Sequence, residues 1–369
     1  GGRKELTMPG RYKEGTVHWE ESRQRWRAFV SVDGRRYSKR FLSRDEALAW
    51  TQKMRLAAHD GSFVAPSAIS LGEWLIKWLG TYKKPTVKPL TYERYLFTAN
   101  KALPLAGISL QKLTPTMLQE LYNSLTPDCA KKLHVLLHGA IQKAWELGMV
   151  RKNVVTFVKP PRVIRQEKGI FTSEELKKMM ELAESDPKLK PYALFLLVAI
   201  NTGMRRGELL GLRWCDVDLE ERTLFIRQQV QTLSGGTLII DTPKTAAGKR
   251  KISIPTKVYQ KLKEAKAALP TIDEEEHDLV FLNRAGTPVR PEAIEKMWKY
   301  LMSKSGLPYR NFHCLRHTHA TLLLANGIPI IEVSRRLGHS SVTQTLDMYG
   351  HAIPCYDKTI AEKIDAIYN

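Results

Sequence analysis

Residues 313–351 read HCLRHTHATLLLANGIPIIEVSRRLGHSSVTQTLDMYGH, and the rest of the chain is best understood around them. His313 and Arg316 stand three residues apart, so on a helix they share one face. An apolar run and a turn at 326–327 follow. A second amphipathic piece then ends at Gly338, a residue suited to a helix C-terminus. The pattern predicts two helices that carry polar side chains toward one point.

Four side chains of this stretch suit chemistry on a phosphodiester. Arg316 offers a planar fork that binds two phosphate oxygens at once. His313 and His339 can donate to an oxyanion or move a proton near neutral pH. Tyr349 follows ten residues after His339, and its free pKa of ~10 makes it a poor nucleophile unless cations activate it. The stretch therefore predicts attack of a phenol on a phosphodiester.

The motifs His-x-Leu-Arg-His, Leu-Gly-His and the later tyrosine closely resemble the C-terminal signature of the tyrosine recombinases, the phage-integrase superfamily. By this resemblance the catalytic positions are His313, Arg316 and His339, and Tyr349 is the nucleophile. The resemblance covers nearly all of the chain and is strongest over residues 170–352.

A second motif, TGMRRGE at 202–208, resembles the first box of the same family, Thr-Gly-x-Arg-x-x-Glu. Arg205 matches the catalytic arginine by register, and we expect Glu208 to orient Arg205 or His313 rather than to transfer a proton. The glycine before the arginine lets the backbone approach a phosphate closely. A solvated helix start is the alternative for this box.

Short strands are predicted at 223–231, 237–240 and 251–254, with the turn TPKTAAGKR at 242–250 between the last two. The family carries its general-acid lysine on such a hairpin, and by register this is Lys244, which would protonate the 5′-oxygen leaving group. Lys249 and Arg250 are predicted to bind phosphate groups of the DNA. A solvated charge run is the alternative for all three.

Composition favours a polyanionic partner. The 369 residues carry a formal net charge of +20, and the sequence pI is about 9.7. Ribosomal and membrane-surface proteins can share such a charge. A hydrophobic content of 43% fits two or three folded domains rather than a basic disordered tail.

Cysteine usage and hydropathy bear on the compartment. The four cysteines form no CxxC pair, so we expect neither a disulfide framework nor a structural zinc site. No apolar run approaches the ~18 residues of a membrane span. The start, GGRKELTMPG, lacks the apolar core of a signal peptide. We expect a cytoplasmic, nucleoid-associated bacterial protein.

Residues 1–62 are expected to form a three-stranded sheet backed by one helix. Alternating runs around Asp33-Gly34 predict a hairpin, and a capping-box pattern at 43–46 opens a helix. The layout resembles, more loosely, the arm-site DNA-binding domain of conjugative-transposon and phage integrases. A basic and aromatic ribbon can enter a major groove, although a solvated sheet face is the alternative. The predicted DNA contacts are Arg25, Arg27, Arg36 and Lys39.

Residues 69–160 follow a linker and are helical in pattern, with apolar residues at 71, 74, 75, 78 and 79 forming one stripe. They resemble the family's core-binding domain, which closes over the DNA face opposite the catalytic domain. The predicted DNA contacts are Lys83, Lys84 and Lys88, and a protein-docking bundle is the alternative.

A second linker at 159–168 leads into the predicted catalytic domain, residues 169–369. A last amphipathic helix at 357–367 is expected to dock on a neighbouring protomer or to pack in cis. His317, His319 and His351 are interpreted as structural or supporting residues. The expected fold class is α+β, mostly α, with a small antiparallel sheet in a mainly helical catalytic domain.

The resemblance implies a site-specific recombinase of a mobile element. Tyr349 would attack a scissile phosphate, which forms a 3′-phosphotyrosine and frees a 5′-hydroxyl; the 5′-hydroxyl of a partner strand then reverses the step. The ester stores the bond energy, so neither ATP nor a metal is expected. Two sequential exchanges of DNA strands through a Holliday junction require a homotetramer on two double-stranded attachment sites. An excisionase and a DNA-bending host factor are further expected partners, and a membrane is not.

Three other functions compete with this interpretation. A metal-dependent nuclease could use His313, His317, His319 and His339, but the carboxylate cluster expected around Mg²⁺ or Mn²⁺ is missing. A non-catalytic DNA-binding regulator could share the fold, although every catalytic position is filled. A chromosome-dimer resolvase of the same family normally lacks the N-terminal sheet, so that sheet favours a mobile-element integrase.

Overall fold

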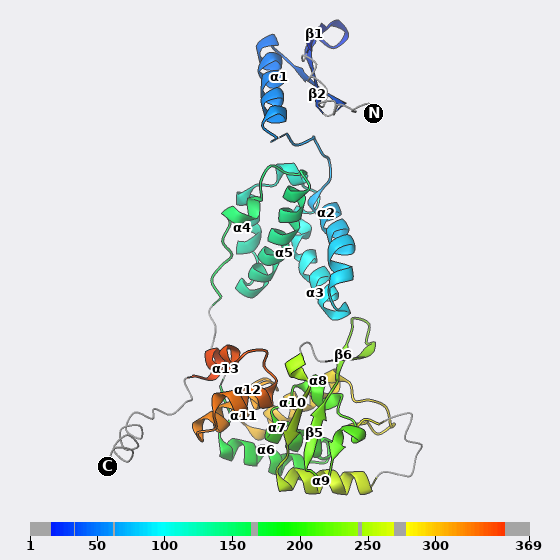
Figure 1. The fold of residues 1–369 in the computed structure, drawn as a ribbon, viewed down its shortest axis with the longest axis vertical. Helices are drawn as coiled ribbons and strands as arrows, with labels where there is room; N and C mark the ends of the chain where they lie inside the picture. The colour runs from blue at the N-terminus through cyan, green and yellow to red at the C-terminus, as the bar shows by residue number, and fades with distance from the viewer. Residues whose placement is uncertain are drawn as a thin grey trace, which may run out of the picture. The chain divides into compact units, whose positions relative to one another are not determined.

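The computed structural model of the protein describes residues 16–32, 34–61, 63–163, 169–242, 246–268 and 278–350 (Figure 1). The chain divides into two compact units, residues 1–164 and 165–369. Lys244, His351 and the helix predicted at 357–367 lie outside the described residues. The mostly helical α+β fold class is confirmed, and the division into three domains stays a prediction.

The first unit begins with an antiparallel sheet in the order β1 (Thr16–Glu20), β2 (Arg25–Val32) and β3 (Arg35–Phe41). Helix α1 (Arg44–His59) follows, and its N-terminus is capped by the side chain of Ser43. Ala28, Val30 and Val32 alternate along β2 and are buried on the side of α1. The intervening side chains of β2 therefore lie on the face that points away from α1. Asp33 of the predicted hairpin turn is outside the described residues.

The rest of this unit is a helical bundle, formed by α2 (Leu71–Trp78), α3 (Pro89–Ala99), α4 (Pro115–Asn123) and α5 (Pro127–Glu146). Ser70 and Glu73 form a capping box at α2, and a proline starts each of the other three, where its missing N–H would have no helical partner. The indole N–H of Trp74 donates to the carbonyl of Ala140 at 2.8 Å, which ties α2 to α5 inside the core.

The part of the second unit that the structure describes is mainly helical and contains two small sheets. The sheets are β4 (Val217–Asp218), β5 (Thr223–Ile226) and β8 (Arg250–Ser253) in that order, and the hairpin β6 (Gln229–Thr232) and β7 (Leu238–Asp241). The helices are α6 (Ser173–Ser185), α7 (Ala193–Thr202), α8 (Arg206–Leu210), α9 (Thr256–Ala267), α10 (Pro291–Ser305), α11 (Cys314–Ala325), α12 (Ile330–Leu337) and α13 (Val342–Tyr349). None of the helices among the described residues is long and apolar enough to cross a membrane.

The single strand predicted at 223–231 is wrong. The chain forms two strands there, and β5 pairs with β8 while β6 pairs with β7. The strands separate because β6 lies directly against α8: a Cβ atom on Gly207 would stand 2.8 Å from the carbonyl oxygen of Val230. The strand predicted at 251–254 forms as β8 and joins the other sheet. Alternation in sequence could not reveal this, because both strands alternate.

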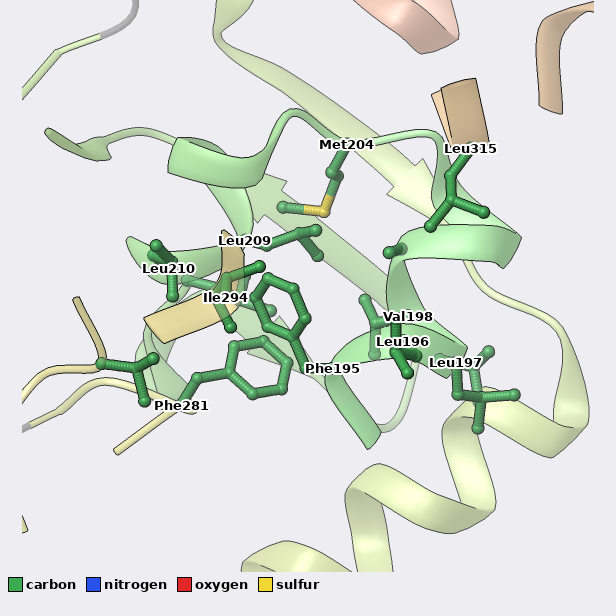
Figure 2. Packing of buried hydrophobic residues seen from close by; sticks show 14 of the residues in the cluster. Phe195, Leu196, Leu197, Val198, Met204, Leu209, Leu210, Phe281, Ile294 and Leu315 are labelled. Atoms are coloured by element: carbon green, nitrogen blue, oxygen red, sulfur yellow. The ribbon is translucent and has the colours of Figure 1, made fainter. Parts of the chain in front are cut away.

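Helix α7 forms the centre of the hydrophobic core of the second unit. Five consecutive residues, 195–199, are buried, so the helix is enclosed on every side. Figure 2 shows Phe195 meeting Phe281 edge to face, with ring centroids 5.1 Å apart. A second, smaller cluster joins α11, α12 and α13 through Ala320, Leu324, Val333, Leu337 and Tyr349. The two clusters fix the ends of α7, α11, α12 and α13, where the polar residues of the site stand.

We expect Leu133→Ala to lower the free energy of unfolding of the bundle by about 2–5 kcal/mol, because truncating this fully buried side chain leaves a cavity. Val135 lies on the same helix and is 65% exposed, so Val135→Ala is the matched control. It should change the free energy of unfolding by less than about 0.5 kcal/mol. Chemical denaturation followed by tryptophan fluorescence, to which the buried Trp74 and Trp78 contribute, measures both. Equal effects of the two substitutions would contradict the packing described here.

Candidate active site

The first arginine of the site stands just beyond the C-terminus of α7. Gly203 ends that helix with a φ of 63°, in the left-handed region that favours glycine, and a Cβ there would lie 2.7 Å from the ring of His319. Arg205 then precedes α8, and its guanidinium donates to the carboxylate of Glu208 at 2.7 Å. The Arg205 side chain is 37% exposed and that of Glu208 is 2% exposed. A buried carboxylate thus holds a guanidinium that reaches the surface.

Glu208 binds a second guanidinium as well. Arg250 of β8 donates through both terminal nitrogens, at 2.9 and 3.2 Å, to the two carboxylate oxygens. Burial opposes the charge of this carboxylate, but Arg250 and then Arg205 more than offset it and lower the pKa of Glu208 to about 2. Glu208 thus binds Arg205, one of the two residues that the sequence analysis expected it to orient, and it also binds Arg250, which the sequence did not suggest.

The predicted phosphate contact by Arg250 does not agree with the structure. Its side chain is only 6% exposed, and besides Glu208 it donates to the carbonyl oxygens of Arg336 and Gly248. The residue joins β8, α8 and the end of α12 from within the protein. The neighbouring Lys249 is exposed, so the predicted phosphate contact fits Lys249 alone of the two.

Arg316 connects the segment that carries Arg205 with the end of α12, which carries Arg336. It is 2% exposed and donates to the carbonyl of Gly203 at 3.0 Å and to that of Leu337 at 2.7 Å. Burial, with Arg205 nearby, lowers the pKa of Arg316 to about 9, so it is charged at neutral pH. A guanidinium has five N–H donors, and these two bonds leave three for another acceptor.

The two histidines predicted to be catalytic differ in exposure. His313 is exposed at the start of α11, and His339 is 7% exposed just after α12. Nδ1 of His339 lies 2.7 Å from the hydroxyl of Thr345. Burial, followed by the charges of Arg316 and Arg205, lowers the pKa of His339 to about 4, so this imidazole is neutral at pH 7.

Tyr349 ends α13 and its side chain points into the protein, where the residue is 2% exposed. Its hydroxyl lies 2.7 Å from Nδ1 of His317, a residue that the sequence analysis interpreted as structural or supporting. Burial raises the pKa of Tyr349, although Arg316 and Arg205 act in the opposite direction. One signal could have found His317: it lies four residues after His313 and so on the same helix face.

The contact between Arg336 and His319, which the sequence analysis did not predict, fixes the end of α12. Arg336 donates to Nε2 of His319 at 3.0 Å, and Nδ1 of His319 lies 3.1 Å from the carbonyl oxygen of Ile200. Burial and Arg336 lower the pKa of His319 to about 4, so its imidazole is neutral. Arg336 also donates to the carbonyls of Asn201 and Ser253. The pair ties α7, α11 and β8 to the residues just before His339.

The predicted DNA contacts of the N-terminal sheet lie on two different faces. In antiparallel pairs, directly opposite residues share a face, and Arg36 stands opposite Ser31, next to Phe29 on β2. Arg25, Arg27 and Arg36 therefore share the face that points away from α1. Lys39 stands opposite the buried Ala28, on the side of α1. The face with Arg36 also carries Arg40, which the sequence analysis did not single out and which pairs with Glu20.

Phe29 organises this face. The guanidinium of Arg36 lies 3.8 Å and that of Arg27 4.8 Å from the centre of its ring, and His18 stacks on the same ring at 5.0 Å. In the bundle, Lys84 is exposed, whereas Lys83 and Lys88 are half-buried, and the ammonium of Lys83 lies 5.0 Å from the ring centre of Trp78.

Three histidines of the site make contacts within the protein. Across the described residues, no group of three or more His, Cys, Asp or Glu side chains is arranged to hold a metal ion. His317, His319 and His339 each place a ring nitrogen against a tyrosine, an arginine or a threonine of the chain itself. These contacts do not favour the metal-dependent nuclease.

Comparison with known proteins identifies the family. The phage integrase family matches residues 170–354, half of the chain, and the N-terminal SAM-like domain of phage integrases matches residues 70–126. The chain belongs to the phage integrase family. It is a tyrosine recombinase, and its activity is site-specific DNA strand transfer of the kind that mobile elements use.

Among the relatives of this recombinase is the tyrosine recombinase XerC-like protein of Caldanaerobacter subterraneus, which is 29% identical over 96% of this chain and 99% of the relative. The ICEBs1 integrase of Bacillus subtilis is 27% identical over 91% of this chain and 94% of the relative. Both alignments extend beyond the two matched family regions.

Solved structures share the fold of the recombinase. The Tn1549 transposon integrase in complex with a circular intermediate DNA has a TM-score of 0.69 and is 21% identical over 81% of this chain and 99% of that chain. A lambda integrase dimer bound to a COC' core site has a TM-score of 0.60 and is 18% identical over 95% of this chain and 97% of that chain.

We expect Glu208→Gln to destabilise the catalytic unit by about 3 kcal/mol at neutral pH, since it leaves the buried Arg250 without its counter-charge. The folded-state pKa of Glu208, about 2, lies below the ordinary ~4.3, so its contribution is complete above that ordinary value and is lost as the pH falls through it toward 2. The difference between wild type and variant should shrink over this range. Denaturation midpoints from pH 7 to pH 3 measure it.

Glu295→Gln is the control for this prediction. Glu295 pairs with Arg206 at 3.7 Å, and its side chain is 57% exposed, so we expect a change of less than about 1 kcal/mol at every pH. If the midpoints of Glu208→Gln ran parallel to those of wild type across the whole range, the stabilising role of the buried carboxylate would be refuted.

Proposed function

We propose that this chain is the integrase of a mobile element and that Tyr349 is its nucleophile toward a scissile phosphate. The observation that carries the proposal is the gathering of two arginines around one point: Arg316 donates to the carbonyl of Gly203, two residues before Arg205, and to that of Leu337, two residues before His339. Burial raises the pKa of Tyr349, and the charges of Arg316 and Arg205 act against this rise, so both arginines are near the phenol.

The reaction begins with attack of the phenol oxygen on phosphorus. A bond forms between Oη and phosphorus, the bond from phosphorus to the 5′-oxygen breaks, and the freed 5′-oxygen takes a proton. Arg205 and the remaining N–H donors of Arg316 would bind the non-bridging oxygens, where charge develops. Lys244 is the proposed proton donor to the 5′-oxygen, and the exposed His313 would donate a hydrogen bond to a phosphate oxygen. The ester keeps the bond energy, so resealing requires neither ATP nor a metal.

Recombination between two sites requires four strand cleavages, which supports a homotetramer of this chain on two duplexes. The formal net charge of +20 supports close association with DNA and a location in the nucleoid. An excisionase and a DNA-bending host factor would choose the direction of the reaction. The bundle would hold the core site, and the exposed Lys84 would be one of its basic contacts.

We further propose that the sheet face with Arg25, Arg27 and Arg36 binds a separate arm site. Arginine forks suit the edges of guanine in a major groove, and a sheet can enter that groove. The stacking of Arg36 on Phe29 supports this role, because it holds the guanidinium in place before DNA arrives. Such a second DNA-binding surface favours a mobile-element integrase over a chromosome-dimer resolvase.

We expect Tyr349→Phe to abolish the covalent protein–DNA adduct while DNA binding stays within about twofold, because only the attacking oxygen is removed. The substrate is a nicked duplex that carries a core site selected from a random library, with EDTA present, and a denaturing gel detects the adduct. Arg316→Lys should reduce adduct formation by about 10²-fold or more, since a lysine cannot replace the planar fork. Nicking that requires Mg²⁺ and survives in Tyr349→Phe would favour the nuclease and overturn the proposal.

We expect Arg36→Ala to weaken arm-site binding about tenfold and to lower the slope of log affinity against log salt by about one. Lys39→Ala is the matched control, because it removes one positive charge from the same strand on the opposite face. Fluorescence anisotropy with the full chain and a labelled duplex, over a range of salt concentrations, measures both slopes. Equal losses of affinity in the two variants would show that DNA does not bind preferentially to the sheet face that carries Arg36.

A further inference from the structure

The hydroxyl of Tyr349 contacts a residue that the proposed reaction has not yet used. It lies 2.7 Å from Nδ1 of His317, within hydrogen-bonding distance. The ring of His339 is nearly parallel to that of Tyr349, with centroids 6.4 Å apart, and its Nδ1 faces Thr345 instead. Among the histidines that the structure describes in the site, His317 is therefore the one whose nitrogen meets the reacting oxygen.

Packing on both sides fixes this contact. His317 lies in the first turns of α11 and is 7% exposed, and the ring of His313, one turn earlier, meets it edge-on with centroids 4.8 Å apart. Tyr349 is held by the small cluster with Leu324, Val333 and Leu337. Because neither ring lies on an exposed loop, the hydrogen bond belongs to the folded site and is not a chance surface contact.

We propose that His317 is a catalytic residue of strand transfer, whose Nδ1 accepts the phenol proton as Tyr349 attacks and returns it when the ester is resealed. This inference rests on the proposed role of Tyr349 as nucleophile. It assigns to His317 the proton transfer for which the sequence analysis had considered His313 and His339.

Each proton and electron pair can be followed through cleavage and resealing. As the Oη–H bond breaks, its electron pair stays on the oxygen that forms the new bond to phosphorus, and the proton moves to the lone pair of Nδ1. The bond from phosphorus to the 5′-oxygen breaks with its pair on that oxygen, which takes a proton from Lys244. On resealing, the 5′-hydroxyl attacks, returns its proton to Lys244, and the leaving phenolate recovers its proton from His317. The neutral imidazole must carry its own hydrogen on Nε2.

The chemistry around the phenol makes a proton acceptor necessary. Burial raises the pKa of Tyr349, so the phenolate is not populated at neutral pH and a bare phenol is a weak nucleophile. A general base positioned on the proton contributes typically 10²–10⁴-fold to a rate. The imidazole of His339 is neutral, but its Nδ1 already faces Thr345.

Two substitutions and two substrates test this role in the full-length chain. His317→Asn keeps a hydrogen-bonding group near the place of Nδ1 but cannot take up a proton, whereas His317→Leu removes both functions. The substrates are nicked duplexes that differ in one atom, with the bridging 5′-oxygen replaced by sulfur in the second. A thiolate leaves without a general acid, so the sulfur substrate isolates the nucleophile side of the reaction.

We expect both variants to form the adduct about 10²-fold or more slowly on the oxygen substrate, with DNA binding unchanged, and to retain most of this defect on the sulfur substrate. Lys244→Ala is the matched control and should recover on sulfur, because only the leaving-group side is impaired. Unchanged binding and an unchanged thermal midpoint of His317→Asn show that this variant is folded.

Three outcomes would overturn the inference. Near-normal cleavage by His317→Asn would make the residue a hydrogen-bonding positioner only. Faster cleavage by His317→Leu would make the contact a latch that withholds the phenol. Recovery of both His317 variants on sulfur would move the residue to the leaving-group side. An adduct that persists in Tyr349→Phe refutes the proposed function itself, which distinguishes the two failures.

Discussion

The buried guanidinium of Arg316 is the interaction on which the rest of the catalytic unit depends. It donates to the carbonyl of Gly203, which ends α7, and to that of Leu337, which ends α12. Helix C-termini leave carbonyl groups without helical partners and carry partial negative charge, so a cation is stabilised between two of them. These bonds bring together segments that lie more than 100 residues apart in sequence. The same charge suits a phosphate, so the group that assembles the site can also bind its substrate.

Charge in the site is balanced by one carboxylate and many carbonyl groups. Arg250 and Arg205 share Glu208, while Arg316 and Arg336 depend on backbone carbonyls and on His319. Burial and, after it, the neighbouring positive charges lower the pKa of Arg316 to about 9 and that of His339 to about 4. A phosphodiester would relieve this repulsion, so the unliganded site already has the electrostatic character that its substrate requires.

Sequence patterns predicted the helical bundle, the N-terminal sheet and the residues that gather around Arg316, but they failed where two distant segments meet. Alternation could not show that residues 223–231 divide between two sheets. Basic residues in a turn could not show that Arg250 points inward to Glu208, 42 residues away. Lys39 and Arg36 both stand on β3, and only the pairing with β2 separates their faces.

The sequence by itself determined which elements form and which side chains each presents, because periodicity, caps and motifs are properties of neighbouring residues. The motif His-x-x-Arg, followed by Leu-Gly-His and then Tyr, can likewise be recognised from the order of residues along the chain. Only the tertiary structure decided which partner each side chain meets. It set the phenol of Tyr349 against His317, 32 residues earlier, and it enclosed Arg250 and His319. Burial and pairing arise from packing between distant segments, and no local pattern contains that information.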